Sequence, residues 1–107
     1  MDDRTWDTVN RLVDWLDRSH DDNGLTPETV RLLRVMKLSE EVGEATQAVI
    51  GALGANPRKG VTHTWLDVEH ELCDVIVTAM VALSTLNPDA RAVFAERLDH
   101  VATRSLG

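Results

Sequence analysis

The chain has 107 residues, 43% of them apolar, which is enough apolar material for one compact domain spanning residues 1–107. Its formal net charge is -7, from 18 acidic and 11 basic residues, so no broad basic surface is available to bind a nucleic-acid polymer. A small phosphorylated ligand is not excluded, because a bound divalent cation reverses the local field of an acidic site.

The sequence carries no sign of secretion or membrane insertion. Cys73 is the single cysteine, which excludes an internal disulfide and a Cys-rich zinc site, and we expect it to be a packed core thiol. The first ten residues, MDDRTWDTVN, lack the basic and apolar regions of a signal peptide. The longest apolar run, Val75 to Leu83, is far shorter than the roughly 20 residues that span a bilayer. We therefore expect a cytoplasmic protein without membrane contact.

Two amphipathic helices are expected in the first half of the chain. From about Thr5 to Ser19, apolar residues recur at steps of three and four, and the turn formers SHDDNG then break the pattern. Thr26 and Pro27 supply an N-cap and a proline at the first helical position. The second helix should therefore run from about Pro27 to Leu53.

Two more helices follow the longest loop, GALGANPRKGVTHT, which contains three glycines and a proline and shows no periodicity. The third helix is expected from about Trp65 to Leu86. Asn87-Pro88-Asp89 repeats the signal of a cap followed by proline, before a fourth helix that reaches roughly to Arg104. Ala, Val and Leu dominate the apolar residues, so the sequence predicts an all-α fold.

The stretch KLSEEVGEATQAV in the second helix places Glu40, Glu41 and Glu44 on one face, together with Lys37. Like charges at this spacing repel one another by a few tenths of a kcal/mol per pair. Considered alone, the face fits an ordinary solvated surface. The opposite side of the helix carries the expected core stripe, namely Val35, Leu38, Val42, Val49 and Ile50.

The third helix changes this interpretation, because DVEHELCDVIVTAMVAL places Asp67, Glu71 and Asp74 within an arc of about 60°. After Asp74 the helix is apolar almost all round, so we expect it in the middle of a bundle with Asp74 shielded from solvent. Buried carboxylates must either take up protons or bind a cation. Mg²⁺ and Mn²⁺ prefer oxygen ligands, and two facing helices offer a set of four carboxylates. These are Glu41, Glu44, Glu71 and Asp74.

The pair of motifs EEVGE and ELCD resembles the EExxE…ExxD signature of the all-α nucleotide pyrophosphohydrolases, and the chain is similar to small MazG-like members over roughly 32–86. The resemblance implies a four-helix MazG-like bundle completed by dimerisation, as a homodimer or a dimer of dimers. It also implies cleavage of a nucleoside triphosphate to the monophosphate and pyrophosphate, with Mg²⁺ held by the four acids. Glu40 is not one of these four acids. By the same resemblance it would orient or deprotonate the attacking water, together with Glu41.

The resemblance also suggests which side chains contact the substrate. The last helix, FAERLDHVATRSLG, lacks the lysine-containing segment of many relatives, which leaves Arg97 and Arg104 as phosphate contacts there. Lys37 is a further phosphate contact or an ion-pair partner of Glu41. Arg58 and Lys59 of the glycine-rich loop could reach a triphosphate, although solvated loop residues are more common. Trp65 or Trp15 could stack on a base, although packing within the protein is the more usual role of such residues.

Three other functions are compatible with parts of the pattern. One is the activity of a phosphoribosyl-ATP pyrophosphohydrolase, and another is a non-catalytic helical dimerisation or regulatory module. A carboxylate-bridged di-iron bundle requires Glu-x-x-His on two helices, and the nearest approach here is Asp67-x-x-His70, once. The base and sugar of the substrate, including any role in removing non-standard nucleotides, have no linear code in the sequence.

Overall fold

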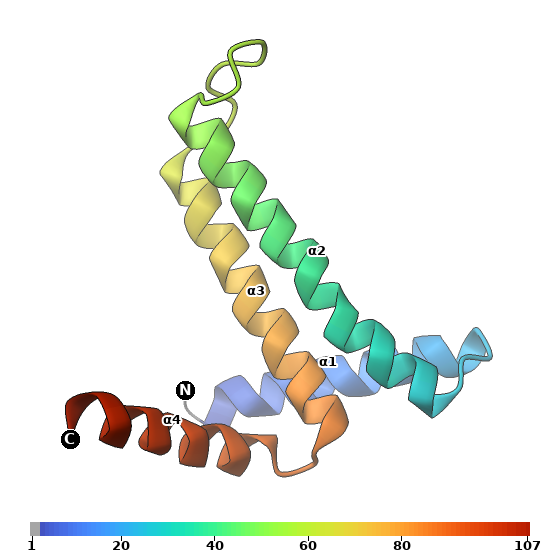
Figure 1. The fold of residues 1–107 in the computed structure, drawn as a ribbon. Coiled ribbons are helices and arrows are strands. Elements are labelled where there is room, and N and C mark those ends of the chain that lie inside the picture. The colour runs from blue at the N-terminus through green and yellow to red at the C-terminus, as the bar shows by residue number, and fades with distance from the viewer. Residues whose placement is uncertain (1–2) are drawn as a thin grey trace.

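The computed structural model describes residues 3–107, which form four helices and no strand. They are α1 (Asp3–Asp22), α2 (Pro27–Leu53), α3 (Trp65–Leu86) and α4 (Ala90–Leu106) (Figure 1). The prediction of an all-α fold is confirmed. No helix among these residues combines the length and the apolarity that a bilayer crossing requires.

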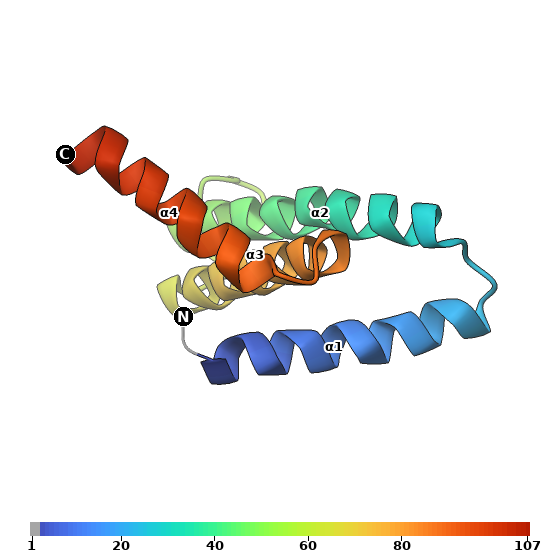
Figure 2. The same ribbon diagram turned by 90° about the horizontal axis from the view of Figure 1, so that it is seen from below.

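The α2 and α3 helices form a long antiparallel pair, and the other two helices pack only near one end of it (Figures 1 and 2). The α1 helix crosses α3 near the C-terminal end of α3, and α4 leaves from that same end. The loop between α2 and α3 lies at the opposite end. The middle of the α2–α3 pair, where the acidic motifs lie, is therefore open to solvent over much of its surface.

The ends of α2 and α3 follow the signals in the sequence. Thr26 caps α2 by accepting a hydrogen bond from the Thr29 N–H at 3.2 Å, and Gly54 ends that helix in the left-handed conformation with φ of 64°. Thr64 and Asp67 form a reciprocal capping box at the start of α3. The hydrogen bond from the Thr64 backbone lowers the pKa of Asp67.

The other two helices differ slightly from their predicted limits. The α1 helix continues one turn beyond Ser19, to Asp22, and ends where Gly24 adopts a positive φ of 72°. The fourth helix begins at Ala90, because Asn87 closes the end of α3 and its side chain accepts a hydrogen bond from the Asp89 N–H at 2.8 Å. Local turns therefore determine where α1 ends and where α4 begins.

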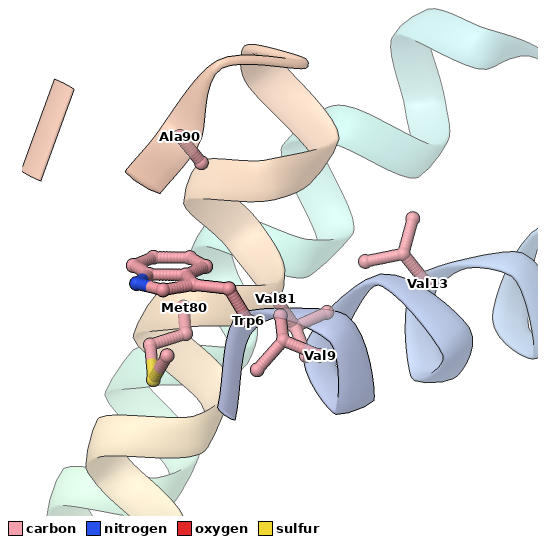
Figure 3. Close-up of a cluster of buried hydrophobic side chains, with 6 residues drawn as sticks. All are labelled: Trp6, Val9, Val13, Met80, Val81 and Ala90. Atoms are coloured by element: carbon pink, nitrogen blue, oxygen red, sulfur yellow. The ribbon is translucent and has the colours of Figure 1, made fainter. Parts of the chain in front are cut away.

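The core is small and lies where α1, α3 and α4 meet (Figure 3). Trp6 is 4% exposed, and its ring lies 6.3 Å from that of Phe94 on α4 in a tilted arrangement. The buried members of this cluster are Trp6, Val9, Val13, Met80, Val81 and Ala90. The core therefore holds one end of α3 and leaves the acidic motifs outside it.

Large apolar surfaces remain exposed in the single chain. The radius of gyration is 16.8 Å, against about 13 Å for a compact domain of this length. On α2, Val35 and Val42 are exposed, so the expected core stripe is only partly covered. On α3, Leu72 and Ile76 are exposed, and Cys73 is exposed rather than packed. The prediction that α3 is surrounded was therefore wrong for one chain, because α1 and α4 reach only its C-terminal half.

A buried arginine that the sequence analysis did not single out connects the first three helices. Arg34 on α2 is 5% exposed and forms an ion pair of 2.8 Å with Asp17 on α1. Its guanidinium also donates to the Thr85 hydroxyl on α3 at 2.9 Å and lies 3.0 Å from Nδ1 of His20 on α1. The Arg34 Nε atom is buried without a hydrogen-bond partner. This network fixes α1 across the α2–α3 pair.

We expect Arg34→Ala to lower the free energy of unfolding by about 2 kcal/mol, because it removes the packing of the arginine stem, the hydrogen bond to Thr85 and an ion pair that is partly screened at the half-exposed Asp17. Arg31→Ala removes the same charge from an exposed position one turn earlier and should change stability by less than about 0.5 kcal/mol. Urea unfolding of both variants measures the difference. Equal changes in the free energy of unfolding of the two variants would show that the contacts of Arg34 contribute nothing beyond its charge.

Candidate metal centre

The acidic motifs of α2 and α3 face each other in the middle of the helix pair. Glu41, Glu44 and Glu71 each place one carboxylate oxygen within 4.8 Å of the others. Glu41 and Glu44 lie one turn apart on α2, and the antiparallel register brings Glu71 of α3 opposite them. We call these three residues the carboxylate cluster.

The carboxylate cluster is partly shielded from water. The side chain of Glu41 is only 13% exposed, that of Glu71 is half-buried, and that of Glu44 is exposed. Oε2 of Glu71 is buried and has no hydrogen-bond partner. Because an unpaired buried carboxylate oxygen is costly, a cation bound at the cluster would supply this atom with a favourable partner.

The carboxylates of the cluster also disturb one another. Burial raises the pKa of Glu41 above its ordinary value of 4.5, and the charges of Glu44 and Asp74 raise this pKa further. The positive charge of Lys37 acts in the opposite direction. The protein alone therefore leaves the negative charge of the cluster incompletely neutralised.

Asp74, the fourth predicted ligand, lies outside the close group. Its side chain is exposed in the single chain, and the expectation of a shielded Asp74 was therefore wrong. The reason is that no other helix covers this part of α3. Asp74 is nevertheless close enough for its charge to raise the pKa of Glu41. It lies at the edge of the carboxylate cluster rather than within it.

Lys37 and Glu40 form a polar pair next to the carboxylate cluster. The Lys37 Nζ donates to Oε1 of Glu40 at 3.0 Å and lies 3.7 Å from Oε1 of Glu41. The predicted pairing of Lys37 with Glu41 is therefore confirmed, with Glu40 as the closer partner. The hydrogen bond to Glu40 raises the pKa of Lys37. Glu40 itself is exposed and does not join the three converging acids.

The other predicted contact residues do not reach the carboxylate cluster within one chain. Arg97 and Arg104 are exposed on α4, which runs away from the α2–α3 pair (Figures 1 and 2). Trp65 is 57% exposed at the start of α3, and Trp15 is 59% exposed on α1. Neither tryptophan is therefore covered within the single chain. Their rings remain available to a ligand or to a second subunit.

Two pockets on either side of the carboxylate cluster were not predicted. The first, of about 310 Å³, lies between α1, α2 and α3 and includes Lys37 in its lining. The second, of about 220 Å³, lies between α2 and the glycine-rich loop. Neither pocket has a clear signal in the sequence, because His20 in the first pocket lies beyond the predicted end of α1 and the second pocket depends on how the loop packs. The first pocket is lined by Leu16, His20, Leu33, Arg34, Lys37, Val77, Thr78 and Val81.

The carboxylate cluster fits a hard divalent cation. Three ligands of an octahedral Mg²⁺ lie about 3 to 4 Å from one another, so carboxylate oxygens within 4.8 Å would have to approach by no more than about 2 Å, which changes of glutamate side-chain torsions can supply. All donors are carboxylate oxygens, which suit Mg²⁺ or Mn²⁺ better than they suit zinc or copper. Oε2 of Glu71 would gain the partner that the protein does not supply. Comparisons of the chain with protein-family models, with curated proteins and with solved structures found no match to any of them.

Proposed function

We propose that this protein is a MazG-like nucleotide pyrophosphohydrolase that uses Mg²⁺ or Mn²⁺. The observation that carries the proposal is the convergence of Glu41, Glu44 and Glu71 around a buried carboxylate oxygen without a partner. The order of the acids, EEVGE on α2 and ELCD on α3, adds to it, because it resembles the signature of that family. The substrate class is a ribo- or deoxyribonucleoside triphosphate.

In the proposed reaction, water is added across the α–β phosphoanhydride, and the products are the nucleoside monophosphate and pyrophosphate. Glu41, Glu44 and Glu71 would hold the cation, with Asp74 joining them from the edge of the cluster. A bound Mg²⁺ would neutralise phosphate charge and make the phosphorus more electrophilic. Glu40, kept close by Lys37, is placed to accept a proton from the attacking water.

The first pocket is a suitable place for the base. It has a volume of about 310 Å³ and a largely apolar wall, which includes Leu16, Leu33 and Val81. Lys37 lies in this wall and also contacts Glu40 and Glu41. A nucleotide with its base in this pocket therefore has its phosphates directed toward the carboxylate cluster.

We expect the protein to form a homodimer in solution, because large apolar residues of α2 and α3 remain exposed in the single chain. A second copy would cover this surface, which includes Val35, Val42, Leu72 and Ile76. Sedimentation equilibrium should give twice the mass of one chain or a multiple of it. A folded monomer at high protein concentration would contradict this expectation.

The proposed function is tested by turnover on a panel of nucleotides that includes ribo, deoxy and modified triphosphates and phosphoribosyl-ATP. We expect Mg²⁺-dependent hydrolysis of at least one triphosphate, with the preferred base and sugar identified by kcat/KM. Exclusive use of phosphoribosyl-ATP would assign the related pyrophosphohydrolase activity instead. Failure with every member of the panel would favour a non-catalytic dimerisation or regulatory module.

A further inference from the structure

The pocket between α2 and the glycine-rich loop, which we call the loop pocket, carries a cation that no carboxylate of residues 3–107 pairs with, whereas Arg34 and Lys37 of the first pocket are paired with Asp17, Glu40 and Glu41. It has a volume of about 220 Å³, and none of the residues that line it is acidic. Its polar side chains include Gln47 from α2 and Asn56, Lys59 and His63 from the loop. A pocket with one lysine and no carboxylate, in a chain of net charge -7, favours an anionic ligand.

Close packing of the loop on α2 shapes this pocket. The Thr62 N–H donates to the Gly51 carbonyl at 3.0 Å, and a methyl group at Gly51 would overlap the ring of His63. Glycine at position 51 is therefore required for the loop to approach the helix this closely. The loop is held in one position, so its polar groups are organised before any ligand binds.

Several hydrogen-bond donors of the loop pocket are free to bind a ligand. Oδ1 of Asn56 accepts from the Arg58 N–H at 3.1 Å, which leaves the Asn56 amide NH₂ as a donor. Nδ1 of His63 lies 2.9 Å from the Thr62 hydroxyl, and Nε2 of the ring is a donor in the tautomer whose Nδ1 accepts from that hydroxyl. Lys59 forms no ion pair with any of residues 3–107. These groups are the type of donor that phosphate oxygens accept from.

The loop pocket follows the carboxylate cluster along α2. Gln47 is three residues and about 4.5 Å beyond Glu44, and Gly51 is seven residues and about 10 Å beyond it. Around the helix, Gly51 lies about 20° and Gln47 about 60° from Glu44, so the near edge of the pocket adjoins the carboxylate cluster. The first pocket lies on the N-terminal side of the cluster along α2, because Leu33 and Lys37, which line it, precede Glu41.

We propose that the loop pocket binds the terminal phosphates of the substrate and the pyrophosphate product, with Lys59 and Gln47 as the main contacts. This assignment rests on the proposed function for its substrate class. The first pocket, the carboxylate cluster and the loop pocket then hold the base, the scissile anhydride and the leaving group in that order along α2. The pyrophosphate product would therefore contact the loop pocket, whereas the monophosphate product would not.

The test measures binding of inorganic pyrophosphate to the full chain by titration calorimetry in the presence of Mg²⁺. Lys59→Ala should weaken this binding roughly 10-fold, because it removes a charge-assisted hydrogen bond. Gln47→Leu, which removes a neutral donor, should weaken it roughly threefold. Of the two loop cations that the sequence suggested as triphosphate contacts, only Lys59 lines the pocket, so Arg58→Ala, in the same loop but outside the lining, is the matched control. It should leave the pyrophosphate affinity within about twofold of that of the unaltered chain.

Equal losses in Lys59→Ala and Arg58→Ala would overturn the inference, since they would indicate only the general field of the loop. Absence of pyrophosphate binding to the unaltered protein would overturn it as well. If pyrophosphate binds with the predicted dependence on Lys59 but no triphosphate is hydrolysed, the loop pocket stands and the proposed function fails. If triphosphates are hydrolysed and Lys59→Ala behaves like Arg58→Ala, the proposed function stands and the loop pocket fails.

Discussion

Glu71→Gln is expected to lower Mg²⁺-dependent release of pyrophosphate at least about 100-fold, because it removes charge from the position where the carboxylates of α2 and α3 converge. The change keeps the size of the side chain and supplies a neutral amide, which binds Mg²⁺ more weakly than a carboxylate does. Steady-state kinetics at increasing Mg²⁺ should show a lower kcat and a weaker apparent affinity for the metal. Far-UV circular dichroism should confirm that the helices remain folded.

Glu69→Gln provides the matched control for this experiment. Glu69 lies two residues before Glu71 on α3, carries the same charge and is exposed outside the carboxylate cluster. Its replacement should change kcat/KM by less than about twofold, because exposed charges have small effects in physiological salt. If both variants lost activity equally, or if neither did, the carboxylate cluster would not be the catalytic centre.

Mg²⁺ or Mn²⁺ is expected to stabilise the folded protein, because the carboxylate cluster forms only when α2 and α3 are paired. At a metal concentration 100 times the dissociation constant, linkage gives about 2.7 kcal/mol, which corresponds to roughly 10 °C or more in Tm for a chain of this size. Thermal unfolding with and without the metal measures this shift. Glu41→Gln should abolish most of it, and an equal shift in the variant would place the metal elsewhere.

Without metal, Glu41 should affect stability in the opposite direction, because its ionised side chain should destabilise the folded protein near neutral pH. Burial and the neighbouring acids raise the Glu41 pKa above 4.5, so the folded state holds this proton more tightly than the unfolded chain does. The stabilising contribution of the group is complete below about pH 4.5 and is lost as the pH rises through the folded pKa. Near pH 7 without metal, Glu41→Gln should therefore unfold at a higher temperature than the unaltered protein. A lower Tm for the variant would contradict this account of the site.

Local signals were sufficient to predict most of the fold. Thr26 with Pro27 and Thr64 with Asp67 fix helix starts through hydrogen bonds between residues close in sequence, and these signals gave the starts of α2 and α3 correctly. The predicted end of α1 and the predicted start of α4 were less accurate, because the polar residues at these positions are compatible with both a helix and a turn. The buried position of Arg34 was not predicted, since its partners Asp17 and Thr85 lie on other helices.

The candidate site was predicted in part, for similar reasons. Helical periodicity and the order of the motifs identified Glu41, Glu44 and Glu71, because a spacing of three residues keeps two acids on one face of a helix and the motifs indicated that the two helices face each other. Periodicity also assigned Asp74 and Cys73 to a covered surface, yet an apolar helix face does not say whether its cover comes from the same chain. The loop pocket could not be predicted, because it depends on how closely His63 approaches Gly51.

The most direct test of the central claim is the product balance of one triphosphate substrate incubated with the protein and Mg²⁺. Monophosphate, diphosphate, pyrophosphate and orthophosphate should be measured separately in the initial phase of the reaction, with a parallel sample in excess chelator. We expect equal amounts of nucleoside monophosphate and pyrophosphate, and no turnover with the chelator. Orthophosphate and nucleoside diphosphate as the first products, or turnover that persists without a divalent cation, would contradict this expectation.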